Sequence, residues 1–287
     1  MLDLLLAPLG YAFMQRGLLA SLVVGVVCAV IGCYVVLRGM AFLGDALAHA
    51  VLPGVAVAYL LRANLLAGAL VAAVAVALGI SALSRNGRLR EDTAIGILFA
   101  AALALGVALM STVKTYSTDL THVLFGNVLG VSEADLWLTA GLAAVVLAAI
   151  ALLYKELLVV FFDPVLATTL GLPVNRLRSL VLVLLALTIV VSLQTVGAGL
   201  VAAMLVTPAA TAQLLTRRLP AMMLLAAVVG AFSALSGLYL SFYVNVASGA
   251  AVVLICTAVF LLALLFAPAR GWVWEWRRGR RALKEAH

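Results

Sequence analysis

Charged residues are scarce in this chain: Asp, Glu, Lys and Arg make up 10% of its 287 residues, whereas a soluble domain averages about 25%. So little charge excludes a soluble enzyme and a disordered chain, because both present a largely polar surface to water. Cysteine is also scarce, with three residues, Cys28, Cys33 and Cys256, which excludes a disulfide-rich secreted domain. All three lie in apolar runs, so we expect buried thiols that pack as small apolar side chains.

Apolar residues take the place of charge: 67% of the chain is hydrophobic and the mean hydropathy is +1.27. The apolar runs last for whole helical turns instead of alternating with polar residues, which excludes a transmembrane β-barrel. Because a spanning helix needs about 20 residues, the sequence predicts an all-α polytopic membrane protein with about nine spans, in the range of eight to ten. We expect a single transmembrane domain over residues 1–287, with spans at 17–37, 41–61, 64–83, 93–113, 136–154, 179–196, 198–216, 220–242 and 250–267.

The basic residues predict how these spans are oriented. With the N-terminus outside and nine alternating spans, all of the 18 Lys and Arg lie on the inner side except Arg16, Arg62 and Lys114. Because Lys and Arg in short loops favour the cytoplasm, the sequence predicts an outer N-terminus and a cytoplasmic C-terminus. The same rule explains the net charge of +7 without a nucleic-acid-binding patch. The basic tail, residues 268–287, is predicted to rest on the inner membrane surface.

Asp45 is the one acidic residue inside a predicted span, and His49 follows it by four residues in FLGDALAHAVLPGVA. This spacing places both side chains on one helix face. An ionisable group near the bilayer centre costs about 2.5–3.5 kcal/mol on insertion scales, so such groups usually mark function. A carboxylate and an imidazole form half of a site for a divalent transition metal. Pro53 and Gly54 interrupt the helix just beyond and free backbone carbonyls along a permeation path.

Two other interpretations of the pair remain open. Asp45 could be a protonated acid hydrogen-bonded to a neighbouring helix, with His49 a satisfied core residue. The pair could instead relay protons in a secondary transporter. One Asp and one His are too few to strip a hydrated metal ion, but a two-fold dimer would supply two of each at its axis.

The loop FFDPVLATTLGLPVNRLR predicts a short helix of its own over residues 163–171. Asp163 suits the N-cap, Pro164 the first helical position and Gly171 the C-terminal stop. On the inner surface such a helix is either a connector or a docking site for a cytosolic protein.

The segment SLQTVGAGLVAAMLVTPAATAQ, residues 192–213, is rich in small and polar residues. Small residues allow helices to approach closely, and Gln194 is a candidate for a buried hydrogen bond. Pro208 indicates a broken or short helix in the seventh span. Helix packing and the lining of a pathway are both open for this segment, and its candidate residues are Gln194, Gly197, Gly199 and Pro208.

Two catalytic motifs are missing from the sequence. The phosphate-binding pattern G-x-x-x-x-G-K-[ST] does not occur, so the chain is not expected to hydrolyse ATP, and the absence of HExxH argues against an intramembrane metalloprotease. A permease for a larger ligand, such as a haem or siderophore, would need no paired ionic ligands, so the Asp45–His49 pair argues against that function.

Several stretches together resemble the ABC-type manganese/zinc/iron permeases. These are FLGDALAHAVLPGVA, LTHVLFGNVLGVSEADL, FFDPVLATTLGL, QTVGAGLVAAMLVTPAATAQLL and NVASGAAVVL, which follow the family's order and cover nearly the whole chain. The resemblance implies a fold similar to that of the vitamin B12 and siderophore importers. It also implies the permease subunit of a bacterial plasma-membrane importer, without a resident cofactor, that works as a homodimer with two cytosolic ATPase subunits and an extracytoplasmic metal-binding protein.

The resemblance also implies roles for particular residues. Asp45 and His49 match the family's coordinating and gating pair, and the 163–171 helix matches the coupling helix that docks on the ATPase. Asp163, Pro164, Leu170 and Gly171 are its expected docking positions. The wording HAVLPGVA is similar to manganese members, so Mn(II) is the expected cargo, with Zn(II) or Fe(II) as the alternatives.

Overall fold

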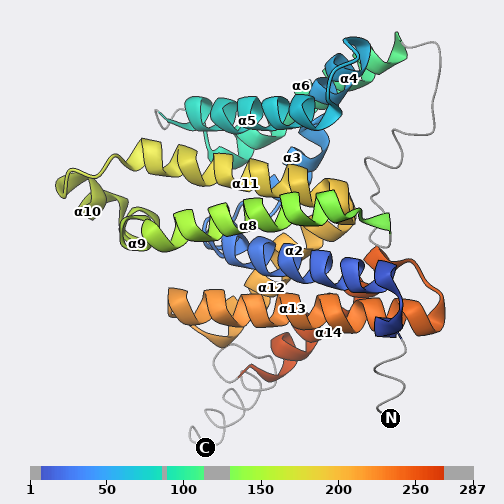
Figure 1. Ribbon diagram of the computed structural model, residues 1–287. Helices are drawn as coiled ribbons and strands as arrows, with labels where there is room; N and C mark the ends of the chain where they lie inside the picture. Colours follow the sequence, from blue (N-terminus) through green and yellow to red (C-terminus); the bar gives the residue numbers. More distant parts are fainter. Residues whose placement is uncertain (1–7, 86–88, 113–129, 268–287) are drawn as a thin grey trace, which may run out of the picture.

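The computed structural model describes residues 8–85, 89–112 and 130–267. Within these ranges it is all-helical, and nine helices or helix pairs are long and apolar enough to cross a membrane, which confirms the predicted fold class (Figure 1). The predicted basic tail, residues 268–287, lies outside the described residues. The elements are η1 (Pro8–Gly10), α2 (Ala12–Leu37), α3 (Leu43–Ala50), α4 (Leu52–Leu60), α5 (Leu65–Ser84), α6 (Glu91–Ser111), α8 (Glu133–Leu152), α9 (Tyr154–Phe162), α10 (Pro164–Thr169), α11 (Val174–Val196), α12 (Ala198–Leu215), α13 (Leu219–Val244) and α14 (Ser248–Phe266).

The spans are not equally buried. α2 and α11 contact each other in the middle of the bundle and are the most enclosed, with 67% and 72% of their most apolar stretches buried (Figure 1). α14 packs on α12 and α13 and is the least enclosed, at 17%. The α3–α4 span is 61% buried although it is the least hydrophobic of the nine. It is therefore an interior element that the rest of the bundle holds in place.

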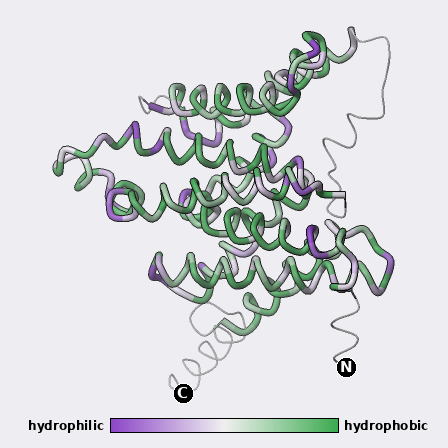
Figure 2. The backbone as a smooth tube through the Cα atoms, viewed as in Figure 1, coloured by the Kyte–Doolittle hydropathy of each residue, from purple (hydrophilic) through white to green (hydrophobic). Residues whose placement is uncertain are grey.

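The helices are hydrophobic along their length, and hydrophilic residues gather mostly at their ends (Figure 2). Three of the buried hydroxyls are satisfied within their own helices: Thr188, Thr195 and Thr211 each donate to a backbone carbonyl one turn earlier. This is the usual way to bury a hydroxyl where no water can reach it.

Local sequence signals set several helix ends. Asn64 caps α5 by accepting from the backbone N–H groups of Leu66 and Ala67. Ser132 and Asp135 form a capping box at the start of α8, a reciprocal arrangement that satisfies free N–H groups. Asn245 ends α13 in the left-handed conformation, with φ of 55°.

The second span is interrupted just after the Asp45–His49 pair. α3 ends at Ala50, α4 starts at Leu52, and Pro53 lies in the first turn of α4. Proline has no N–H to donate to the carbonyl four residues earlier, which belongs to His49. That carbonyl instead accepts from the N–H of Val51. The interruption is the one that Pro53 predicts.

Gly197 joins α11 to α12 in a conformation that other residues avoid. Its φ of 88° and ψ of 159° lie in a region that is essentially restricted to glycine. The sequence indicated Gly197 as a small packing residue, and the structure gives it a backbone role at this corner. α12 itself is short, at 18 residues, but it is not broken, because it continues through Pro208.

Several boundaries differ from the sequence prediction. α2 begins at Ala12, ahead of the predicted span at 17. The predicted fifth span, 136–154, ends as α8 at Leu152, and a separate helix, α9, continues to Phe162 where a loop was expected. α11 begins at Val174, ahead of the predicted span at 179. The differences at α9 and α11 extend helices at the end of the bundle that carries α10 (Figure 1).

Candidate metal site

Asp45 and His49 lie on α3 with one turn between them. The Nε2 atom of His49 is 3.6 Å from the Oδ1 atom of Asp45. Asp45 is in the first helical turn, where the positive end of the helix dipole favours a negative side chain. The pair thus presents one oxygen and one nitrogen ligand toward the same space.

Burial separates this pair from the rest of α3. The other residues of the helix are buried, whereas the side chains of Asp45 and His49 are 56% and 37% exposed. α3 packs against α5, α6, α11 and α12, and the ring of Phe99 on α6 lies 6.2 Å from that of His49. Four helices therefore hold α3 so that its one uncovered face carries both ionisable groups.

One chain does not complete a metal site by itself. Among the described residues, no third His, Cys, Asp or Glu joins the pair. The three thiols are free and buried, which agrees with their expected packing role, and the Sγ atom of Cys28 faces the hydroxyl of Ser192 at 3.9 Å. Soft sulfur ligands are thus kept away from Asp45 and His49, which leaves a ligand pair of the kind that suits first-row divalent ions.

Gln194 is exposed on α11, so the expected buried hydrogen bond is wrong. Gln194 lines a cavity of about 110 Å³ together with Val51, with Val55 of α4 and with residues of α5. The cavity thus reaches the residue that joins α3 to α4. Gly199 has no atom within 4 Å of the position of a Cβ, so it is not a close-packing contact, whereas Pro208 is buried in α12.

The end of the bundle that carries α10 presents a different surface. Asp163 caps α10 through its Oδ1 atom, which accepts from the N–H of Leu166 at 2.9 Å, and Gly171 follows with φ of 74°. Val165 and Leu170 are 73% and 61% exposed. α10 therefore presents apolar side chains outward.

A cavity of about 470 Å³ lies beside α10 and was not indicated by the sequence. Its lining includes Arg85, Arg176 and Arg178, which come from the end of α5 and the start of α11. No acidic side chain of the described residues lines it. This end of the bundle thus combines apolar and basic surface.

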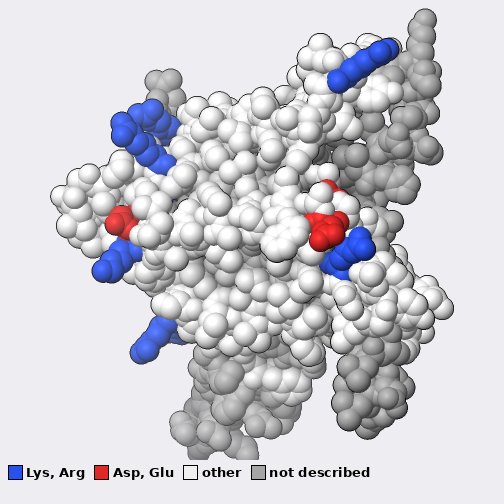
Figure 3. All heavy atoms as spheres, viewed as in Figure 1, with Lys and Arg blue, Asp and Glu red and all other residues white. Residues whose placement is uncertain are grey.

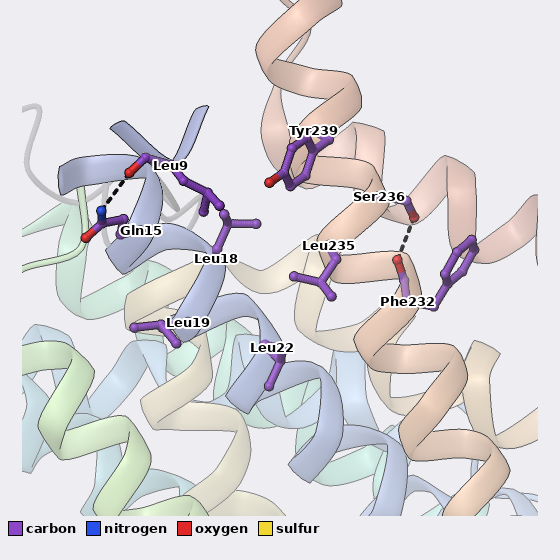
Figure 4. Close-up of a pocket in the computed structure, with 9 residues that line it drawn as sticks. All are labelled: Leu9, Gln15, Leu18, Leu19, Leu22, Phe232, Leu235, Ser236 and Tyr239. Carbon is purple, nitrogen blue, oxygen red and sulfur yellow. Dashed lines mark hydrogen bonds between the residues drawn. The ribbon is translucent and has the colours of Figure 1, made fainter. Parts of the chain in front are cut away.

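A larger cavity, of about 800 Å³, opens between α2 and α13 (Figure 4). Its wall is mainly leucine, and the polar groups of Gln15 and Ser236 are engaged with the backbone carbonyls of Leu9 and Phe232. The described residues that line it include no carboxylate, imidazole or thiol, so they do not suit a metal ion.

Nine candidate spans within the described residues, with an ionisable pair on an interior span, point to a polytopic membrane permease. The family comparison agrees: residues 10–267 match the ABC 3 transport family, and the chain belongs to that family. It is the membrane subunit of a bacterial ABC transporter and not the ATPase.

Individual relatives and solved structures are similar over most of the chain. The manganese transport system membrane protein MntC of Halalkalibacterium halodurans is 50% identical, with 96% of this chain and 94% of the relative covered. A probable iron transport system membrane protein of Haemophilus influenzae is 41% identical, with 94% and 99% covered. The PsaBC structure from Streptococcus pneumoniae, in complex with Fab, has a TM-score of 0.81 at 40% identity and covers 93% of this chain and 96% of its own.

A more distant structure shows how widely the fold is shared. An inward-facing ABC transporter described as metal-chelate type has a TM-score of 0.68 at 17% identity, with 88% of this chain and 85% of that chain covered. This agrees with the expected likeness to importers of larger metal complexes, at the level of the fold alone.

Proposed function

We propose that this chain is the permease subunit of an ABC importer that moves Mn(II) into the cytoplasm. The observation that carries the proposal is the uncovered face of α3, where a carboxylate and an imidazole lie 3.6 Å apart within a membrane span. The choice of Mn(II) is supported by the 50% identity to a manganese transport protein. Zn(II) and Fe(II) remain the alternatives, the latter supported by the iron relative.

A second copy of the chain would complete the site. Asp45 and His49 are exposed on the single chain, yet ionisable groups in a span normally face protein or a water-filled path rather than lipid. A two-fold axis beside α3 would bring two carboxylates and two imidazoles together. Four such side chains can replace part of the hydration shell of a divalent ion, which one chain cannot do.

The orientation rests on the basic side chains. On the face shown in Figure 3, Lys and Arg gather mainly at the end of the bundle where α10 lies, and fewer are found at the other end. This distribution supports, by the positive-inside rule, an orientation with α10 in the cytoplasm and the start of α2, at the opposite end, outside.

The two ends of the bundle would bind different partners. In this orientation the exposed apolar side chains of α10 face the cytosol, where two ATPase subunits would dock. A binding protein would deliver the ion to the outer end. Transport would proceed by alternating access: docking of ATP-loaded partners moves α10, and the bundle switches which side reaches Asp45 and His49. The pair must hold the ion weakly, because an ion that binds too tightly cannot leave.

The proposal is tested by reconstituting the permease with its ATPase and binding protein in liposomes. We expect Mn(II) to accumulate only with ATP, and Zn(II) and Fe(II) to compete poorly. Preferred accumulation of Zn(II) or Fe(II) would change the cargo, and uptake driven by a proton gradient without the ATPase would favour a secondary transporter instead.

The apolar surface of α10 gives a prediction for ATPase docking. Leu170→Asp is expected to weaken retention of the ATPase roughly tenfold or more, because a charge would be buried in the interface. Co-purification of the ATPase with tagged permease measures this effect. Leu61→Asp is the matched control, since Leu61 is 73% exposed but lies in the turn after α4. Equal retention by both variants would exclude α10 as the docking element.

A further inference from the structure

Arg38 lies at the centre of a small polar junction at the end of α2. Its Nη1 atom pairs with the Oε1 atom of Glu91. The guanidinium carbon is 4.7 Å from the ring centre of Phe161, and the ring of Tyr34 meets that of Phe161 edge-on at 4.7 Å. We call these four residues, Tyr34, Arg38, Glu91 and Phe161, the Arg38 junction.

The junction is largely enclosed. The side chains of Arg38 and Glu91 are 13% and 26% exposed, and Tyr34 is fully buried. Arg38 is the one Lys or Arg of the described residues with a carboxylate partner. Enclosed ion pairs contribute little net stability, because desolvating both charges offsets their attraction. The contact therefore calls for an explanation other than stability.

The junction connects the docking end to the metal-site helix. Phe161 is in the last turn of α9, two residues before Asp163, which caps α10. Arg38 directly follows α2, and the turn after it leads into α3. Any displacement of α10 that moves Phe161 thus acts on Arg38, which precedes the turn into α3.

Glu91 extends the connection to the site itself. It is the first residue of α6, and the same helix carries Phe99, whose ring is 6.2 Å from that of His49. α6 also packs against α3 and α4. The ion pair therefore joins the end of α2, just before the turn into α3, to the helix whose Phe99 lies beside His49.

A second cation lies near the carboxylate of Glu91. Arg178, in the first turns of α11, lies within electrostatic reach of both Arg38 and Glu91, and its buried Nε atom has no hydrogen-bond partner among the described residues. Without the charge of Glu91, two arginines would repel each other across this space.

We propose that Arg38 is a positioning residue that transmits movement of α10 to Asp45 and His49, through its contacts with Phe161 and Glu91. This inference rests on the proposed function, because it assigns how ATPase docking reaches the metal pair. In a tightly packed bundle a small shift at α10 becomes a discrete rearrangement rather than a graded one. The ion pair and the ring contact must move together for the shift to reach α3.

The test is the amount of Mn(II) imported per ATP hydrolysed by the reconstituted transporter. Arg38→Ala and Glu91→Gln are expected to lower this ratio about tenfold, within the range of roughly 5–150-fold that coupled sites show, while ATPase assembly and hydrolysis persist. The charge exchange R38E with E91R is expected to restore part of the ratio. Arg38→Lys keeps the charge but loses the planar contact with Phe161, so an intermediate ratio is expected.

Matched controls are available at the same end of the bundle. Arg90→Ala and Asp92→Asn remove exposed charges next to Glu91 and are expected to leave the ratio unchanged. An unchanged ratio in Arg38→Ala and Glu91→Gln, or a loss that only follows a lower yield of assembled complex in every variant, would overturn the inference. Wild-type protein that imports no metal with ATP would instead reject the proposed function.

Discussion

Asp45→Ala and His49→Ala are each expected to lower Mn(II) uptake by about 100-fold or more. Loss of a residue that only hydrogen-bonds to a metal ligand already lowers metal affinity or activity by roughly 10–100-fold. In a two-fold dimer each substitution removes two of the four ligands at once. Uptake of radioactive manganese by cells with intact partners, at matched permease levels, measures the effect.

Asp45→Asn distinguishes a metal-binding carboxylate at Asp45 from a protonated acid that hydrogen-bonds to a neighbouring helix. An amide keeps the size and the hydrogen bonds of a protonated acid but loses the negative charge that a cation needs. If the carboxylate binds metal, we expect the Asp45→Asn variant to transport as poorly as the Asp45→Ala variant. Asp92→Asn, which removes an exposed acid of α6, is the control. Uptake at the wild-type level in the alanine variants would remove the pair from the pathway.

Gly54→Ala and Gly68→Ala are expected to destabilise the protein by about 1–3 kcal/mol each, the usual range for overpacking. A Cβ on either glycine would overlap the carbonyl oxygen of the other, so α4 and α5 touch through their backbones. Neither backbone can move aside without shifting its whole helix. The melting temperature of the purified protein in detergent, which is expected to fall by several degrees, reports this change.

A matched substitution checks that the effect comes from contact and not from loss of glycine. Gly141 lies within α8 and has no atom within 4 Å of the position of a Cβ. Gly141→Ala is therefore expected to leave the melting temperature unchanged or to raise it, because alanine favours helix. A melting temperature that stays at the wild-type value in Gly54→Ala would mean that α4 and α5 do not pack as closely as described.

Much of the fold could be predicted from the sequence because a bilayer imposes a length and a composition on each span. The nine candidate spans of the described residues and the break at Pro53 depend on local residues. α9 was missed because the segment 154–162 is too short to span and follows α8 almost directly. The exposure of Gln194 was also missed, because hydropathy depends on residue type alone. It does not indicate which face of a helix is covered by neighbouring helices.

Of the candidate site, the sequence indicated what depends on spacing within one helix. The separation of Asp45 and His49 by four residues already placed them together, and their role as metal ligands stays a prediction. The Arg38–Glu91 pair gave no such signal, because 53 residues separate its partners along the chain. Contacts of this kind are set by how helices pack, and no local pattern encodes them.

Because all three thiols are buried, the native chain is expected to react little with thiol reagents. Cys28, Cys33 and Cys256 are free and enclosed, so a cysteine introduced at an exposed site would provide the main reactive sulfur. Ala63→Cys after α4 and Thr168→Cys on α10 are exposed at opposite ends of the bundle. In the proposed orientation, a maleimide that cannot cross membranes would label the Ala63→Cys variant in intact cells and the Thr168→Cys variant only after lysis. The native protein, which should label weakly, is therefore the control for this chemical test of membrane orientation.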